Sequence, residues 1–189
     1  MNPWPSLPLA SWRDTYATLH RWTQIPGKIK LARTPLVNHW WNIAFLVTPR
    51  GPTTGSIPEG SGSFEMEFDF VDHRLVVTTS RRERKEIPLA PRSVARFYEE
   101  VVATLASLGI SVPIWTMPVE LPDPVRFEED ETHASYDPRA VDNFLGSILR
   151  SNYVFQRFRP QFVGTSSPVH LFLVRFHLPV TNFSAPPAP

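Results

Sequence analysis

Residues 64–70 alternate strictly between apolar and acidic side chains. The apolar ones are Phe64, Met66, Phe68 and Phe70, and the acidic ones are Glu65, Glu67 and Asp69. A period of two residues is typical of a half-buried strand. Asp72-His73 then has the composition of a turn, and the β-branched run Leu75–Thr79 is typical of a returning strand. The pattern predicts a β-hairpin here.

Two other segments are apolar on both faces. The first is Trp40–Thr48, with His39 at its start beside two tryptophans, and the second is Val169–Leu178. Strands that are apolar on both sides are usually central in a sheet and covered on both faces. We therefore expect two central strands here. Shorter strands are expected at Val112–Trp115 and, on a sheet edge, at Glu86–Leu89.

Helical spacing of apolar residues predicts three helices. The first is expected at Trp12–Thr23, where Pro26-Gly27 should end or kink it. The second begins at Pro91 and ends before Gly109, and the third follows an Asp137 N-cap and ends near Pro160. The predicted fold class is α+β, an antiparallel sheet of about five to seven strands packed by three helices.

Loops and tails complete the predicted organisation. Pro49–Gly62 is rich in Gly, Pro, Ser and Thr, and we expect a flexible connection that could cover a site. Its glycines lack the Lys and the following helix of a phosphate-binding loop. We expect a single domain over residues 1–180 and a Pro-rich disordered tail over residues 181–189.

Composition narrows the function classes more than it identifies one. The 189 residues carry a formal net charge of +1, so no global field attracts nucleic acid or a membrane, and neither partner is expected. With no cysteine, disulfides, thiolate nucleophiles and Cys-based metal sites are excluded. No segment is apolar for long enough to span a bilayer, and none resembles a signal peptide. We expect a cytoplasmic protein; its oligomeric state is open.

Histidines and carboxylates are the remaining candidates for catalysis. The candidates are His39, His133, His170, Asp130 and Asp72. The acidic stretch 128–137 would present Asp130 and His133 to a site, although an acidic loop before a helix explains it more simply. No HExxH motif, i/i+4 histidine pair or GxSxG elbow supports a metal site or a serine nucleophile. Cofactor and metal therefore stay unknown, and whether the protein is an enzyme is uncertain.

A ligand-binding site is the other possibility. The candidate ligand-binding residues are Asn38, Trp40, Trp41 and His73, although aromatic residues at this place are more often part of the core. The basic residues Lys28, Lys30 and Arg33 would bind an anion under one interpretation. A solvated charged face is the favoured interpretation of that segment.

Three function hypotheses follow. The leading one is a small-molecule-binding domain with an aromatic pocket that includes His39. The alternatives are a hydrolase that uses His and Asp, with or without a metal, and a structural or protein-interaction domain. Convergence of His39, His133 and His170 in one cleft would favour the hydrolase, whereas separate histidines would count against it.

Six segments together resemble a family of bacterial proteins, a domain-of-unknown-function family of the 5996 type. They are WPSLPLASWRDTYATLHRWTQIPGKIKLA, PLVNHWWNIAFLVT, FEMEFDFVDHRLVV, PRSVARFYEE, MPVELPDPVRFEEDETHASYDP and SSPVHLFLVRFHLPVTNFS. The resemblance covers nearly the whole chain, but it implies little about function. It implies a further aromatic- and Gly-rich segment in longer members, so this chain is expected to be a short member or a truncation. Pro26 departs from the family pattern, in which that turn of helix continues.

Overall fold

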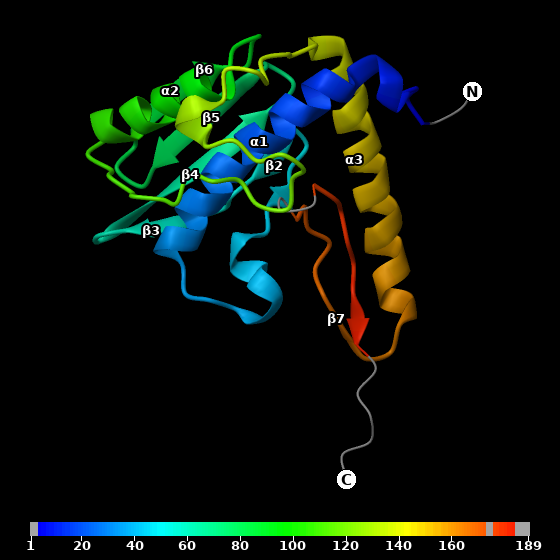
Figure 1. Cartoon of the computed structure of the whole chain (residues 1–189). Coiled ribbons are helices and arrows are strands. Elements are labelled where there is room, and N and C mark those ends of the chain that lie inside the picture. Colours follow the sequence, from blue (N-terminus) through cyan, green and yellow to red (C-terminus); the bar gives the residue numbers. More distant parts are fainter. Residues whose placement is uncertain (1–3, 173–175, 184–189) are drawn as a thin grey trace.

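The computed structural model describes residues 4–172 and 176–183, which form an α+β fold (Figure 1). Its α-helices are α1 (Leu9–Arg33), α2 (Val94–Ser107) and α3 (Pro138–Phe158), and its 3₁₀ helices are η1 (Asn38–Ile43), η2 (Phe127–Glu129) and η3 (Arg159–Gln161). Its strands are β1 (Leu46–Val47), β2 (Pro52–Thr53), β3 (Ile57–Glu59), β4 (Gly62–Asp69), β5 (Arg74–Thr79), β6 (Arg84–Pro88), β7 (Thr165–Ser166) and β8 (Asn182–Phe183). The predicted fold class is confirmed.

The larger sheet is antiparallel and is built around the predicted hairpin. Its order is β1-β2-β4-β5-β6, and β3 also pairs with β4. In the hairpin, Phe64 pairs with Thr79 and Asp69 pairs with Arg74. The alternating phenylalanines and the methionine of residues 64–70 are all buried. The hairpin and β6, which lies near the predicted edge strand, are confirmed.

Helices α1 and α2 cover the apolar face of this sheet, while α3 runs along one side of the molecule (Figure 1). Trp22 of α1 stacks on Phe97 of α2 with ring centroids 4.4 Å apart, and Phe97 in turn stacks on Phe68 of β4. These rings join two helices and the central strand in one core. None of the helices that the structure describes is long and apolar enough to cross a membrane.

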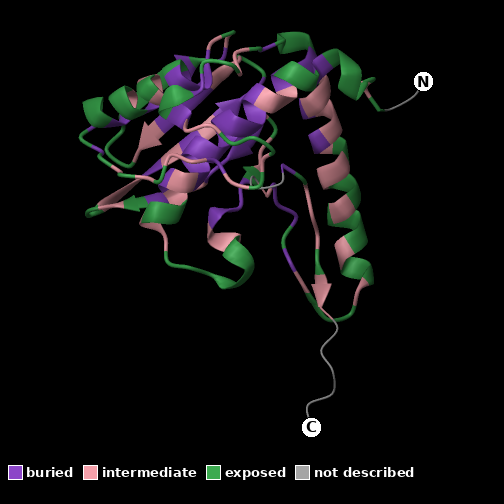
Figure 2. Ribbon diagram, in the orientation of Figure 1, coloured by how far each residue is buried: buried purple, intermediate pink, exposed green. Residues whose placement is uncertain are grey.

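Helix α1 is longer than predicted and passes through Pro26. Proline removes a backbone donor and normally kinks or ends a helix. Here every residue from 18 to 27 is buried, as the purple central part of this helix shows (Figure 2). Tertiary packing around the whole circumference therefore keeps the helix continuous, and the predicted end before Pro26 is wrong.

The predicted central strand Trp40–Thr48 is also wrong. Its first part is the 3₁₀ segment η1, where His39 and Trp40 adopt left-handed backbone angles with φ of 59° and 55°. Only Leu46–Val47 form a strand, and it lies at the end of the sheet order. The apolar side chains of this segment lie in different environments: Phe45 is fully buried, whereas Trp40 is 56% exposed. An apolar run alone did not distinguish these cases.

The segment Pro49–Gly62 is not the flexible cover that its composition suggested. It contains β2 and β3, which both pair with β4. Thr54 accepts a hydrogen bond from the Met66 amide through Oγ1, at 3.0 Å, and donates its own amide to the Met66 carbonyl. The glycines and threonines of this segment thus allow it to pack closely against the central strand β4.

Two other predicted strands are not regular strands. Val112 and Ile114 pack against the core, but no strand is assigned over Val112–Trp115. Within Val169–Leu178, residues 173–175 lie outside the described residues. Around them, Leu171 makes an isolated bridge with Phe45, and Phe172 makes one with His177. The described part of the segment therefore is not a central strand of the larger sheet.

The end of the chain includes a short pair of strands. β7 pairs with β8 through Thr165–Phe183 and Ser166–Asn182. β8 falls within the segment expected as a tail, and residues 184–189 of that tail lie outside the described residues.

The remaining helix ends largely follow the predicted signals. Ser93, two residues after Pro91, caps α2 by accepting a hydrogen bond from the Arg96 amide. Gly109 follows α2 with φ of 71°, as expected for a left-handed stop. Asp137 caps α3 through the Arg139 amide, as predicted.

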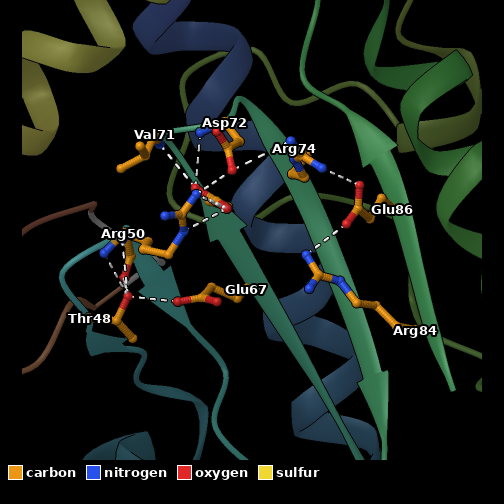
Figure 3. A network of polar contacts seen from close by, with 10 residues as sticks. Thr48, Arg50, Glu67, Val71, Asp72, Arg74, Arg84 and Glu86 are labelled. Carbon is orange, nitrogen blue, oxygen red and sulfur yellow. Dashed lines mark hydrogen bonds and ion pairs between the residues drawn. The ribbon is translucent and has the colours of Figure 1, made fainter. Parts of the chain in front are cut away.

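The other face of the hairpin carries a network of charged side chains (Figure 3). Arg50 contacts Asp69 at 2.7 Å and Asp72 at 2.5 Å. Arg74 forms ion pairs with Asp72 and Glu86. Asp69 is buried, and the hydrogen bond from Arg50 helps to lower its pKa against the opposing effect of burial. This network of ion pairs connects β4, β5 and β6 on one face of the sheet.

Candidate functional site

The structure does not bring the three candidate catalytic histidines together. His39 and His170 both lie against the ring of Trp41, with centroid distances of 5.7 and 6.3 Å. His133 instead contacts Asp130, with Nδ1 2.8 Å from Oδ2. Among the described residues, no hydrogen bond, ion pair or ring contact joins His133 to His39 or His170. These contacts give no support to the hydrolase hypothesis.

His170 occupies a packed position. It is buried, and its Nδ1 lies 2.8 Å from the Pro168 carbonyl oxygen. Burial lowers the pKa of His170, which favours the neutral ring at physiological pH. Trp41 also contacts Phe183 of β8, with centroids 5.7 Å apart. His170 and Trp41 therefore help to join η1 to the C-terminal strands.

Asp130 and His133 have a structural task at the start of α2. The buried Asp130 carboxylate accepts hydrogen bonds from the amides of Thr132 and His133, both at 3.1 Å. The carbonyls of Asp130 and His133 accept the first amides of α2. Asp130 also pairs with Arg21 of α1, with Nε and Oδ2 3.3 Å apart and both side chains buried. This loop caps α2 and connects it to α1.

His73 and Asp72 lie in the turn between β4 and β5. His73 Nδ1 is 2.9 Å from the Tyr136 hydroxyl, and its Nε2 is 3.6 Å from Asp142. Burial raises the pKa of Tyr136, so this hydroxyl stays protonated. Asp72 belongs to the charged network of the sheet. Over residues 4–172 and 176–183, no cluster of three or more His, Asp and Glu side chains suits a metal ion.

The most site-like feature is a pocket of about 310 Å³. It lies between α1, η1, the segment after α2 and Phe172, and we call it the Trp40–Trp115 pocket. Its lining residues are Gln24, Gly27, Lys28, Leu31, Trp40, Ile43, Trp115, Val119, Glu120 and Phe172. Three aromatic rings and several aliphatic side chains make this surface mostly apolar, as ligand pockets usually are.

Local sequence features explain how the pocket forms. Gly27 has no side chain, so the backbone of α1 is open to the pocket at that position. The Gln24 amide pairs with the backbone of Val119 in both directions, each bond 2.9 Å long. This pairing holds the irregular segment after α2 beside α1. Trp40, whose backbone is left-handed, completes the lining from η1.

Lys28 is the cationic member of the pocket lining. Its side chain is half-buried, and its Nζ lies 4.6 Å from the centroid of the Trp115 ring. Burial lowers the pKa of Lys28, and no carboxylate offsets that effect. Lys30 is also half-buried and donates to the Ala44 carbonyl oxygen at 2.8 Å. Neither lysine belongs to the solvated face that we favoured from the sequence.

Lys30 gives a testable pH dependence. Burial lowers its pKa from 10.5 to about 8. Between these values the unfolded chain binds a proton that the folded protein has released, so the Lys30 contribution to stability rises with pH. We expect wild type to gain about 1–2 kcal/mol relative to Lys30→Met between pH 7 and pH 10, after allowance for partial exposure.

Urea denaturation at both pH values measures this change. Lys85→Met, at an exposed position, is the control for loss of one positive charge. An equal difference between wild type and Lys30→Met at the two pH values would contradict the assignment.

The sequence indicated only part of this pocket. Trp40 was a candidate and lines it, whereas Trp41 and His39 contact the C-terminal strands instead. Asn38 is exposed at the start of η1, and His73 lies in the turn between β4 and β5. Trp115 and Phe172 were missed because each comes from a segment predicted as a regular strand. Lys28 carried a signal, as one member of a basic segment considered for anion binding.

Comparison with known proteins identifies a family without naming an activity. Neither the curated proteins nor the solved structures contain a match to this chain. A family model, described as a family of unknown function, matches residues 4–189. The resemblance seen in the six sequence segments is thus confirmed over almost the whole chain. The chain belongs to the family DUF5996.

Proposed function

We propose that this protein binds a small, largely apolar molecule with a planar ring system in the Trp40–Trp115 pocket. The observation that carries the proposal is the exposure of two tryptophans around one pocket, at 56% for Trp40 and 61% for Trp115. Large aromatic side chains contribute most when they are buried, so their exposure around a hollow suits a ligand that covers them. A cytoplasmic location, compatible with the absence of cysteine, is part of this proposal.

Backbone strain at Trp40 supports the same function. His39 and Trp40 are consecutive non-glycine residues with positive φ. Such conformations cost about 1–3 kcal/mol each and occur preferentially at ligand sites and active sites. A purely structural role for η1 would not require this strain to hold an aromatic ring largely in solvent.

The pocket suits binding better than hydrolysis. The described residues of its lining include no histidine and no pair of side chains with the geometry of a nucleophile and base. Gln24, a polar group in the lining, is already paired with backbone. Pocket size also limits the ligand, because about 310 Å³ is at the lower end for small-molecule sites. One or two fused rings fit this volume.

The proposal is tested with two naphthalene probes, naphthalene-2-carboxylate and naphthalene-2-methanol, by tryptophan fluorescence and isothermal titration. We expect at least one to bind wild type, and Trp115→Ala to weaken that binding about tenfold through loss of a stacking surface. Trp4→Ala is the matched control, since Trp4 is 44% exposed and lies outside this pocket. Absence of binding at millimolar probe, or equal weakening by both substitutions, would contradict the proposal.

A further inference from the structure

We infer that the ligand of the Trp40–Trp115 pocket is an anion, an apolar carboxylic acid whose carboxylate binds Lys28. This inference rests on the proposed function, because it assigns the chemical class of the ligand in the same pocket. Among the described residues of the pocket lining, Lys28 and Glu120 carry a charge.

Lys28 has no acidic partner among the residues that the structure describes. Its contact is with the face of Trp115, with Nζ 4.6 Å from the ring centroid. The ion pairs of other basic residues show that the fold supplies carboxylates elsewhere: Arg21 has Asp130 and Arg33 has Glu59. Partial burial disfavours a charged ammonium group that has no acidic partner, so an anion would stabilise it. The position therefore leaves a cation ready for an anion from outside the protein.

Two other polar side chains of the described lining, Glu120 and Gln24, also interact within the protein. Both ends of the Gln24 amide form hydrogen bonds with the Val119 backbone, with Oε1 accepting and Nε2 donating. A ligand therefore meets apolar and aromatic surface over most of its area, and it also meets the ammonium group of Lys28. Complementarity to this arrangement requires an apolar body with one negative group.

A carboxylate fits this cation better than a phosphate ester does. Phosphate sites usually combine several donors, such as an arginine fork or a series of backbone amides at a helix N-terminus. Lys28 instead lies within α1, well away from its N-terminus at Leu9. A single ammonium group is a point charge with three donors, which suits one carboxylate.

The two naphthalene probes test the inference because they share the ring system and differ in one substituent, a charged carboxylate in one and a neutral hydroxymethyl group in the other. In wild type we expect the carboxylate to bind at least about tenfold more tightly than the alcohol, the usual gain from a charge-assisted hydrogen bond. Lys28→Met keeps the length and apolar stem of the side chain but removes the charge. This variant should lose the preference for the acid, so that its affinities for the acid and the alcohol become about equal. Lys85→Met, exposed on β6, should keep the preference.

Salt gives a second measurement that needs no variant. Raising the ionic strength should weaken binding of the carboxylate and leave the alcohol nearly unchanged. This readout remains available if Lys28→Met does not fold, which circular dichroism will show.

The outcomes separate the two proposals. Equal affinity of wild type for acid and alcohol, or a preference that survives in Lys28→Met, would overturn the carboxylate inference and leave the pocket as a ligand site. A salt dependence shared by both probes would also overturn it. If neither probe binds, the proposed function itself fails.

Discussion

Replacing Asp130 with alanine is expected to lower the free energy of unfolding by about 3–5 kcal/mol. The Asp130 carboxylate is fully buried and pairs with the buried Arg21, 3.3 Å from its Nε. Removing one partner leaves an uncompensated charge in the interior, which is costly. The substitution also takes an acceptor from the amides of Thr132 and His133, in the loop that caps α2. Urea denaturation monitored by circular dichroism measures the loss.

A double variant distinguishes the effect of the unpaired buried charge from the effect of the lost hydrogen bonds to the loop amides. Asp130→Asn keeps an oxygen for the two amides, and Arg21→Met removes the opposite charge. Combined, these substitutions should recover most of the stability that Asp130→Ala loses, because no unpaired charge is then buried. A loss below about 1 kcal/mol for Asp130→Ala would contradict the structural role of this pair.

Gly51→Ala is expected to destabilise the protein by about 3–5 kcal/mol, from strain and steric overlap together. A Cβ at this position would lie 2.0 Å from the carbonyl oxygen of Phe68, and Gly51 has φ of +149°. The obstructing atom belongs to the backbone of β4, so it cannot rotate away. Displacing it would disturb the central strand and the adjoining Arg50–Asp69 pair. The midpoint of urea denaturation reports the effect.

Gly60→Ala is the matched control for Gly51→Ala. Gly60 also has positive φ, at +56°, but an added Cβ would meet no atom within 4 Å. We expect it to cost only about 1 kcal/mol, from the backbone conformation alone. Equal losses for the two variants would show that contact with Phe68 does not determine the requirement for glycine at position 51.

The sequence predicted the elements whose two faces differ. Strand β4 alternates because one face packs on the helices and the other carries charged side chains, so its period is visible in the sequence. Helices α2 and α3 each bury one stripe, and residues such as Ser93 and Asp137 mark where they begin. In these elements, local pattern and tertiary environment agree.

Elements in uniform surroundings could not be predicted in the same way. Helix α1 is buried on all sides near Pro26, so it has no contrasting faces to reveal its full length. The apolar run around Trp40 combines buried core with an exposed ring, a distinction that composition does not encode. Hydrophobic periodicity reveals an element only when one of its faces is apolar and the other is polar, and neither segment has that contrast.

The candidate pocket was harder to predict than the fold, for a related reason. Its lining comes from α1, η1, the segment after α2 and Phe172, which are distant in sequence. Trp40 could be proposed because it stands beside other aromatic residues. Trp115 and Lys28 can be recognised as pocket residues only from their contact with one another. Such contacts depend on tertiary structure, for which a single sequence gives no direct signal.

The buried proline of α1 has a consequence for the order of folding. An isolated segment interrupted by Pro26 would be a poor helix, because nucleation is unfavourable and proline removes a hydrogen bond. During synthesis this segment leaves the ribosome before β4, β5 and α2, the elements that surround it in the native state. Its apolar side chains therefore stay exposed until these elements have also been synthesised. Helix α1 is translated before its partners but becomes stable only with them, and its exposed apolar side chains favour aggregation in the interval.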